Sequence, residues 1–104
     1  MYIVIRKFNQ MHSVRQAARR AEAGLGEILK KSPGFRGYYV FDAGKGVAGS
    51  VTLFDSQKGA AEANEKALAW IRESLTDHIN GEPEVIAGEV LAVVTPQPDP
   101  SLSA

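Results

Sequence analysis

The order in which hydrophobic patterns follow one another along the chain constrains the fold most. Segments rich in β-branched and aromatic residues alternate with segments whose apolar residues recur at helical spacing. These two patterns predict strands and amphipathic helices, respectively. The predicted strands are residues 2–8, 35–42, 47–55 and 84–94, and the predicted helices are 13–31 and 56–79. This β-α-β-β-α-β order predicts an α+β, ferredoxin-like fold, with a four-stranded antiparallel sheet that carries both helices on one face.

Short polar motifs mark the ends of the predicted helices. Ser13 is followed three residues later by Gln16, which is the pattern of a capping box at a helix start. Residues 32–34 (SPG) stop this first helix, and Ser56 is a suitable cap for the second.

The chain fits a single domain with a short tail. A length of 104 residues is enough for one hydrophobic core. We assign the domain to residues 1–94. Residues 95–104 (TPQPDPSLSA) hold three prolines and little apolar surface, so we expect them to form a disordered tail.

Most predicted strands are apolar or small on both sides, which is unusual for a sheet with one face open to water. In the last strand, one side carries Val85, Ala87, Leu91 and Val93, and the other carries Ile86, Val90, Ala92 and Val94. An open apolar face of this kind is normally covered. We therefore predict a homodimer in which two copies pack sheet to sheet.

Composition excludes several classes of function. Twelve basic side chains balance twelve acidic ones without a basic patch, so we expect no nucleic-acid partner. The chain has no cysteine and two isolated histidines, so we predict no disulfide, thiolate nucleophile, preformed metal site or other cofactor. No apolar run approaches the roughly 20 residues of a membrane span. The first strand begins too early for a signal peptide, so we expect a cytoplasmic location.

The helix at residues 56–79 carries polar residues on its apolar side. At about 100° per residue, that side collects Ala60, Ala63, Ala67, Trp70, Ile71 and Leu75. Asn64 and His78 fall near its centre, and Ser74 lies within it. A buried amide or imidazole without a partner costs roughly 1–3 kcal/mol. The pattern therefore predicts either polar groups satisfied inside the core or polar groups that line a cavity.

Four stretches resemble a known family: residues 33–39 (PGFRGYY), 53–55 (LFD), 64–73 (NEKALAWIRE) and 88–90 (GEV). Together they resemble the dimeric α/β-barrel superfamily, in particular its antibiotic-biosynthesis-monooxygenase-like branch. The resemblance covers residues 2–94. It implies a dimeric α/β barrel with a pocket between the sheet and the helices. It also implies a candidate chemistry, because cofactor-free members oxidise polycyclic phenols with dioxygen, using Asn, Trp, Tyr and His side chains.

From the resemblance and the helix pattern we predict Asn64, His78 and Trp70 as catalytic residues. The amide of Asn64 would hold a phenolate or enolate oxygen, and His78 would act as a general base. The predicted pocket comprises Asn64, Trp70, Ser74, Tyr39 and Asn9. Tyr38 and Tyr39 must point to opposite faces of one strand, so only one of them faces the helices.

Each of these residues also has a purely structural interpretation. Asn64 would bond to a strand edge or a backbone carbonyl, His78 would cap the helix C-terminus, and Trp70 would fill the core. Glu89, which stands alone in an apolar strand, is predicted to pair with Arg6 or Arg36, or else to titrate as a buried acid.

Three functions follow as alternatives. The first is cofactor-independent monooxygenation of an aromatic or quinol-like small molecule, and it expects Asn64, a histidine and a tyrosine to converge on one cavity. The second is a non-catalytic dimeric module that binds a hydrophobic metabolite or a partner protein, and it expects these groups to be satisfied separately. The third and most distant is haem binding or degradation, for which Asn9, Trp70 and His78 match by residue type.

Overall fold

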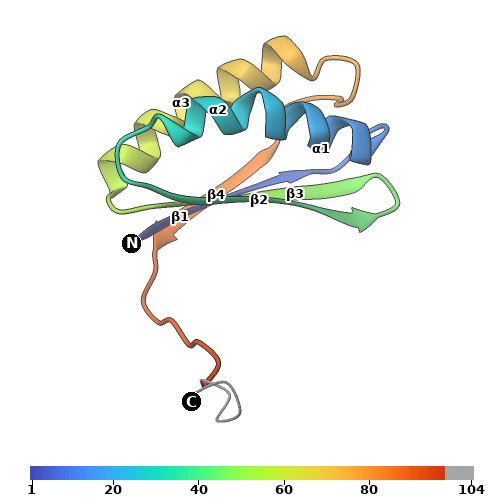
Figure 1. The fold of residues 1–104 in the computed structure, drawn as a ribbon. Coiled ribbons are helices and arrows are strands. Elements are labelled where there is room, and N and C mark those ends of the chain that lie inside the picture. Colours follow the sequence, from blue (N-terminus) through green and yellow to red (C-terminus); the bar gives the residue numbers. More distant parts are fainter. Residues whose placement is uncertain (98–104) are drawn as a thin grey trace, which may run out of the picture.

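The computed structural model describes residues 1–97, and it has the predicted α+β, ferredoxin-like architecture (Figure 1). The elements are β1 (Tyr2–Phe8), α1 (Val14–Ala23), α2 (Leu25–Lys30), β2 (Phe35–Gly44), β3 (Val47–Phe54), α3 (Gln57–Ser74) and β4 (Glu84–Glu89). The strands form one antiparallel sheet in the order β2-β3-β1-β4. The helices lie on one face of this sheet and leave its other face open. The predicted tail falls mainly on residues 98–104, which lie outside the described residues.

The predicted first helix is divided into α1 and α2 at Gly24. The indole ring of Trp70 lies against this glycine, and a Cβ placed there would come within 2.5 Å of a ring carbon. Glycine therefore leaves space for the tryptophan and lowers helix propensity at the same point. The predicted capping box is wrong: Ser13 has a left-handed backbone (φ 52°) and its side chain makes no capping hydrogen bond. The cap on α3 is confirmed, because Ser56 Oγ accepts a hydrogen bond from Gly59 N at 3.1 Å.

Two other elements end earlier than the sequence predicts. Helix α3 ends at Ser74, because the following segment turns and Ile79 forms an antiparallel bridge with Met11. Strand β4 ends at Glu89, whose partner in the register is Tyr2, the first residue of β1. The pairing with β1 stops at this residue, although Val90 N still donates a hydrogen bond to Met1 O at 2.8 Å, so register, and not the apolar pattern, sets the end of β4.

The core lies between the sheet and the helices, and strand alternation selects the residues that enter it. In β1 these are Val4, Arg6 and Phe8, and in β3 they are Ala48, Ser50, Thr52 and Phe54. Small residues of α3 cover them: Ala60, Ala63 and Ala67, followed by Ile71. Arg6, Ser50 and Thr52 thus form a polar strip inside an otherwise apolar layer.

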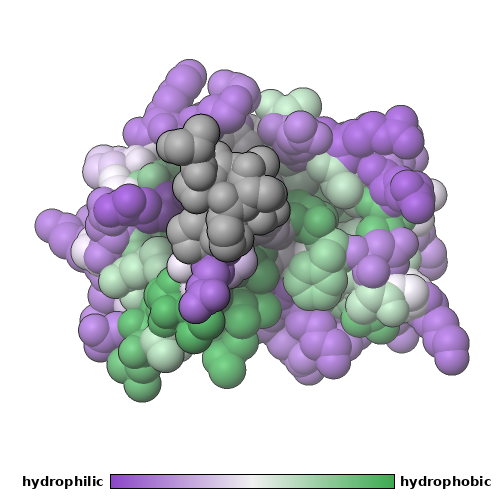
Figure 2. All heavy atoms as spheres, turned by 60° about the horizontal axis from the view of Figure 1, so that its bottom comes forward, coloured by the Kyte–Doolittle hydropathy of each residue, from purple (hydrophilic) through white to green (hydrophobic). Residues whose placement is uncertain are grey.

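The open face of the sheet is also apolar, as the sequence predicts. Tyr39 is 61% exposed on this face, Phe41 is 49% exposed and Ile86 is 68% exposed. Figure 2, which brings this side forward, shows hydrophobic residues gathered at the lower left and to the right of the centre. Among the described residues, no helix is both long enough and apolar enough to cross a membrane.

Candidate functional site

Arg6 is the centre of a polar cluster between the sheet and α3. It points to the helix side of β1 because it alternates with Val4 and Phe8, and it is only 1% exposed. Its Nε donates a hydrogen bond to Asn64 Oδ1 at 2.9 Å. Its Nη1 reaches the hydroxyl oxygens of Thr52 at 3.2 Å and Ser50 at 3.4 Å. All three acceptors are neutral oxygens, and β3 presents two of them because its register sets Ser50 opposite Arg6.

The positive charge of Arg6 has no carboxylate partner within residues 1–97. The ion pairs in this part of the chain are Lys30–Glu27, Arg36–Asp55 and Arg72–Glu82, all at the surface. Burial lowers the pKa of Arg6 from its usual value, and the nearby Tyr38 opposes this effect. An arginine still keeps its proton at neutral pH. The protein therefore holds a cation in its core with neutral partners alone, which is an unfavourable arrangement.

Tyr38 completes the cluster from β2. It lies opposite Thr52 in the register and on the same face of the sheet as Arg6. Burial raises the pKa of Tyr38 to about 12, while the charge of Arg6 acts in the opposite direction. The phenol is thus protonated at neutral pH and can donate a hydrogen bond. We use the name Arg6 cluster for Arg6, Tyr38, Ser50, Thr52 and Asn64.

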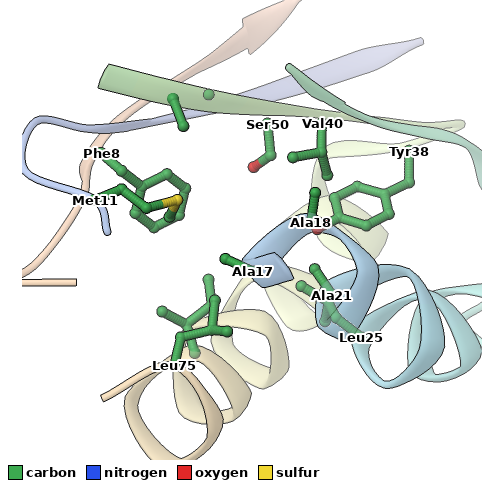
Figure 3. A pocket seen from close by; sticks show the side chains of 13 residues that line it. Phe8, Met11, Ala17, Ala18, Ala21, Leu25, Tyr38, Val40, Ser50 and Leu75 are labelled. Carbon is green, nitrogen blue, oxygen red and sulfur yellow. The ribbon is translucent and has the colours of Figure 1, made fainter. Parts of the chain in front are cut away.

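A hollow lies next to the Arg6 cluster, between the sheet and the helices (Figure 3). Its polar lining comes from Tyr38 and Ser50, and its apolar lining includes Phe8, Met11, Leu25, Val40, Ile71 and Leu75. In Figure 3, Tyr38, Val40 and Ser50 project from the sheet toward Ala17, Ala18 and Ala21 of α1. These alanines create the space because they fill so little of it.

The hollow is modest in size. It is far smaller than the several hundred Å³ of a typical ligand pocket. The part that admits the centre of a water molecule is only about 20 Å³, enough for about one water. A ligand of one or two rings therefore requires α1 or a lining side chain to move.

The predicted site residues converge only in part. Asn64 belongs to the Arg6 cluster, and its partner is a guanidinium, not a backbone carbonyl. Tyr39 lies on the opposite, open face, so Tyr38 occupies the position at the hollow that we predicted for Tyr39. The reason is the register: Tyr38 faces Thr52, whose side chain is buried, whereas Tyr39 faces Val51 on the open side.

The remaining predicted residues lie away from the hollow. His78 is buried beyond the end of α3, where its Nδ1 is 2.8 Å from the carbonyl oxygen of His12. Trp70 is half-buried and packs against Gly24. Ser74 accepts a hydrogen bond from Arg20 through its backbone oxygen, and Asn9 is exposed in the loop after β1. Of the three groups that the enzyme hypothesis expects to converge, only a tyrosine, Tyr38, lines the hollow; neither a histidine nor the amide of Asn64 does.

Most members of the Arg6 cluster were not predicted from the sequence, although the alternation along each strand places them on the same side as apolar core residues. Arg6 is in phase with Val4 and Phe8, as Ser50 and Thr52 are with Ala48 and Phe54. The predicted pairing of Glu89 with Arg6 or Arg36 is wrong. Glu89 is exposed and makes no ion pair among the described residues. Arg6 instead bonds to Asn64, and Arg36 bonds to Asp55.

No group of three or more His, Asp or Glu side chains within residues 1–97 is placed to hold a metal ion.

Several solved structures share this fold at low sequence identity. A monooxygenase from the gene ActVA-Orf6 of Streptomyces coelicolor, in complex with nanaomycin D, has a TM-score of 0.73 at 15% identity, over 92% of each chain. A putative antibiotic biosynthesis monooxygenase from Nitrosomonas europaea has a TM-score of 0.68 at 19% identity, over 88% of this chain and all of the other. A point mutant of MhuD, with two manganese protoporphyrin IX bound per active site, has a TM-score of 0.66 at 19% identity, over 92% of this chain and 100% of that one.

These likenesses confirm the fold of the antibiotic-biosynthesis-monooxygenase-like branch, which the sequence suggested. No protein-family model matches the sequence, and no curated protein is significantly similar to it. The chemistry must therefore be argued from the site itself.

Proposed function

We propose that this protein binds an aromatic or quinol-like small molecule in the hollow and oxidises it with dioxygen, without a cofactor. The observation that carries the proposal is the composition of the hollow: apolar walls with one polar end, formed by Tyr38 and Ser50, directly beside the buried guanidinium of Arg6. Apolar walls suit a flat ring, and a convergent polar end suits a ring hydroxyl. The fold is shared with monooxygenases, which agrees with this assignment.

The electrostatics of the site suit such a reaction. An electron-rich ring reacts with dioxygen most readily as a phenolate or enolate. Fixed donors and a nearby cation stabilise such an anion strongly where water is scarce. Arg6 supplies the charge, Asn64 orients it through the Nε hydrogen bond, and the protonated Tyr38 supplies a donor at the hollow. We assign Trp70 and His78 supporting roles in holding α3 and the adjoining loop.

The reaction balances without an external reductant. In its keto form, a phenol or quinol has a ring carbon that carries two hydrogens, and this carbon keeps one oxygen atom of dioxygen as a carbonyl. Both hydrogens leave with the other oxygen atom as water. The substrate thus supplies all the electrons that reduce dioxygen.

We further propose that the protein works as a homodimer that buries the open sheet face. The exposed side chains of Tyr39, Phe41 and Ile86 on one flat face support this assignment, because monomers rarely leave such patches uncovered. The cytoplasmic location expected from the sequence remains a prediction.

A non-catalytic binding module is the second candidate. It is favoured by one observation: every fully buried polar side-chain atom within residues 1–97 already has a hydrogen-bond partner, and the side chains of the half-buried Asn64 and of His78 are also bonded. Such a site would hold the same class of ligand without turnover.

Oxygen uptake with a panel of hydroxylated naphthalenes, anthrones and naphthoquinols separates the two candidates, alongside binding measured under argon. We expect both binding and uptake in the wild type, and loss of both in Ala18→Leu, which fills the hollow. Ala69→Leu, on the exposed side of α3, is the matched control. Binding without uptake would favour the module, and a wild type that neither binds nor oxidises any member of the panel would rule out both candidates.

A further inference from the structure

We propose that Arg6 is an anion-recognition residue, and that the ligand of the hollow is an aromatic molecule with a negatively charged oxygen, either a carboxylate or an ionised phenol. The inference rests on the proposed function for the position of the ligand. It goes further by predicting that the resting site prefers an anionic ligand to a neutral one of the same shape, with or without turnover, and that Arg6 causes this preference.

The first argument is the unbalanced charge. Arg36 and Arg72 lie at the surface and each has a carboxylate partner, whereas Arg6 is buried and has only neutral partners among residues 1–97. A buried cation without a counter-ion destabilises a fold. Residues of this kind are typical of binding sites, where a ligand supplies the missing charge.

The second argument is the remaining hydrogen-bonding capacity of Arg6. Nε and Nη1 are bonded to Asn64, Ser50 and Thr52, which fix the plane of the guanidinium. Nη2 takes part in none of these bonds, and since every fully buried side-chain nitrogen or oxygen within residues 1–97 has a partner, Nη2 is not fully buried. A planar guanidinium with N–H groups to spare matches the geometry of an oxyanion.

The third argument is position. Ser50 and Tyr38 form part of the wall of the hollow, whereas Arg6 does not. Arg6 lies directly behind Ser50 and beside Tyr38. An oxyanion at this end would accept hydrogen bonds from both hydroxyl groups and face the guanidinium behind them. Since little water reaches this end, the attraction would be stronger than at the surface. The apolar wall from Phe8 to Leu75 would receive the ring.

The test uses two pairs of probes that differ in charge but little in shape. The first pair is 1-naphthoate and 1-naphthamide, and the second is 1-naphthol, titrated through its ionisation, and 1-methoxynaphthalene. Affinities are measured by calorimetry under argon, with the full-length protein. We expect at least one anionic probe to bind about tenfold or more tightly than its neutral partner, as charge-assisted hydrogen bonds would give. Whether naphthoate or ionised naphthol shows the preference identifies the carboxylate or the phenolate as the preferred oxyanion.

Two variants identify Arg6 as the source of the preference. Arg6→Met keeps a long apolar stem and should reduce the preference to less than about twofold, whereas Arg6→Lys should keep part of it. Asn64→Asp places a carboxylate next to the guanidinium and should remove the preference while Arg6 is still present. Arg36→Met, which removes a surface arginine from the strand that also carries Tyr38, is the matched control and should change nothing.

The proposal is overturned if the wild type binds charged and neutral partners equally, or binds none of the four probes. It is also overturned if Arg6→Met keeps the preference, or, should that variant fail to fold, if Asn64→Asp keeps it. Oxygen uptake is measured separately. Charge preference without uptake would support Arg6 as an anion-recognition residue and count against oxidation, while uptake without charge preference would do the reverse.

Discussion

Arg6 on β1 and Asn64 on α3 stand 58 positions apart in the sequence and are joined by a 2.9 Å hydrogen bond from Nε to Oδ1. This contact explains why an amide occupies the centre of an apolar helix face. The amide accepts from a buried cation, orients it, and ties the second half of the chain to the first strand. The site and the fold thus depend on the same bond.

Asn64→Leu should lower the free energy of unfolding by roughly 1–3 kcal/mol, because Arg6 Nε would lose its acceptor inside the core. The two side chains are similar in size, so cavity effects should be small. Urea melts of wild type and variant measure the change. A variant as stable as the wild type would show that the Arg6–Asn64 bond contributes little to the fold.

Asn64→Asp is the matched variant, because it keeps an acceptor at the same position. The guanidinium should hold the pKa of the new carboxyl below the value of about 4 expected in the unfolded chain. Its stabilising contribution is then fully present above the unfolded pKa and is lost as the pH falls through the lower, folded pKa. Melts from neutral to acid pH should show this loss in the variant and not in the wild type.

Tyr38 should make the free energy of unfolding depend on pH in the alkaline range. Its pKa is raised by burial from 10.0 to about 12, so the folded protein keeps the phenol proton longer than the unfolded chain does. The associated stability is present below pH 10 and is lost as the pH rises toward about 12, by an amount on the order of 1–3 kcal/mol. Tyr38→Phe should remove this component. Parallel urea melts and a phenolate absorbance titration would reveal it, and identical pH profiles for the two proteins would contradict it.

Gly24→Ala should destabilise the protein by roughly 1–3 kcal/mol and shift the fluorescence of Trp70, since the new Cβ would lie 2.5 Å from the indole ring. Gly26→Ala is the matched control within the same helical region. Its Cβ would meet nothing closer than 3.7 Å, so it should stabilise α2 by up to about 1 kcal/mol. Thermal melts decide the matter, and equal effects of the two substitutions would refute the packing argument.

The open sheet face should hold two copies together. Sedimentation at micromolar concentration should show a dimer of 11.2 kDa subunits. Ile86→Glu should shift the equilibrium toward monomer by placing a charge on the apolar face. Lys58→Glu, on the exposed side of α3, should leave the dimer intact. A wild type that sediments as a monomer would remove the reason for a sheet-to-sheet interface.

Deletion of residues 97–104 should leave stability nearly unchanged, because the segment has little apolar surface to bury. Denaturant melts of the shortened and the complete chain test this. A loss greater than about 1 kcal/mol would show that the tail docks on the domain or on a second copy.

Sequence periodicity was enough to predict which residues of each element share a side, although it placed Tyr39 instead of Tyr38 at the pocket. The apolar stripe of α3, the cap at Ser56, and the opposite directions of Tyr38 and Tyr39 all follow from the spacing of residues within one element. The β-α-β-β-α-β order similarly predicted the sheet. These features depend on local geometry, which a sequence contains directly.

Contacts between elements were decided by the tertiary structure. The pairing of Arg6 with Asn64, the break of the first helix against Trp70, and the end of β4 at Glu89 each depend on register and packing over long separations. Periodicity says which side chains share a face of an element, but not which groups that face meets. For this reason the sequence by itself determined the layers and their apolar faces, whereas only the folded chain brought a buried cation, an amide and a phenol together beside one hollow.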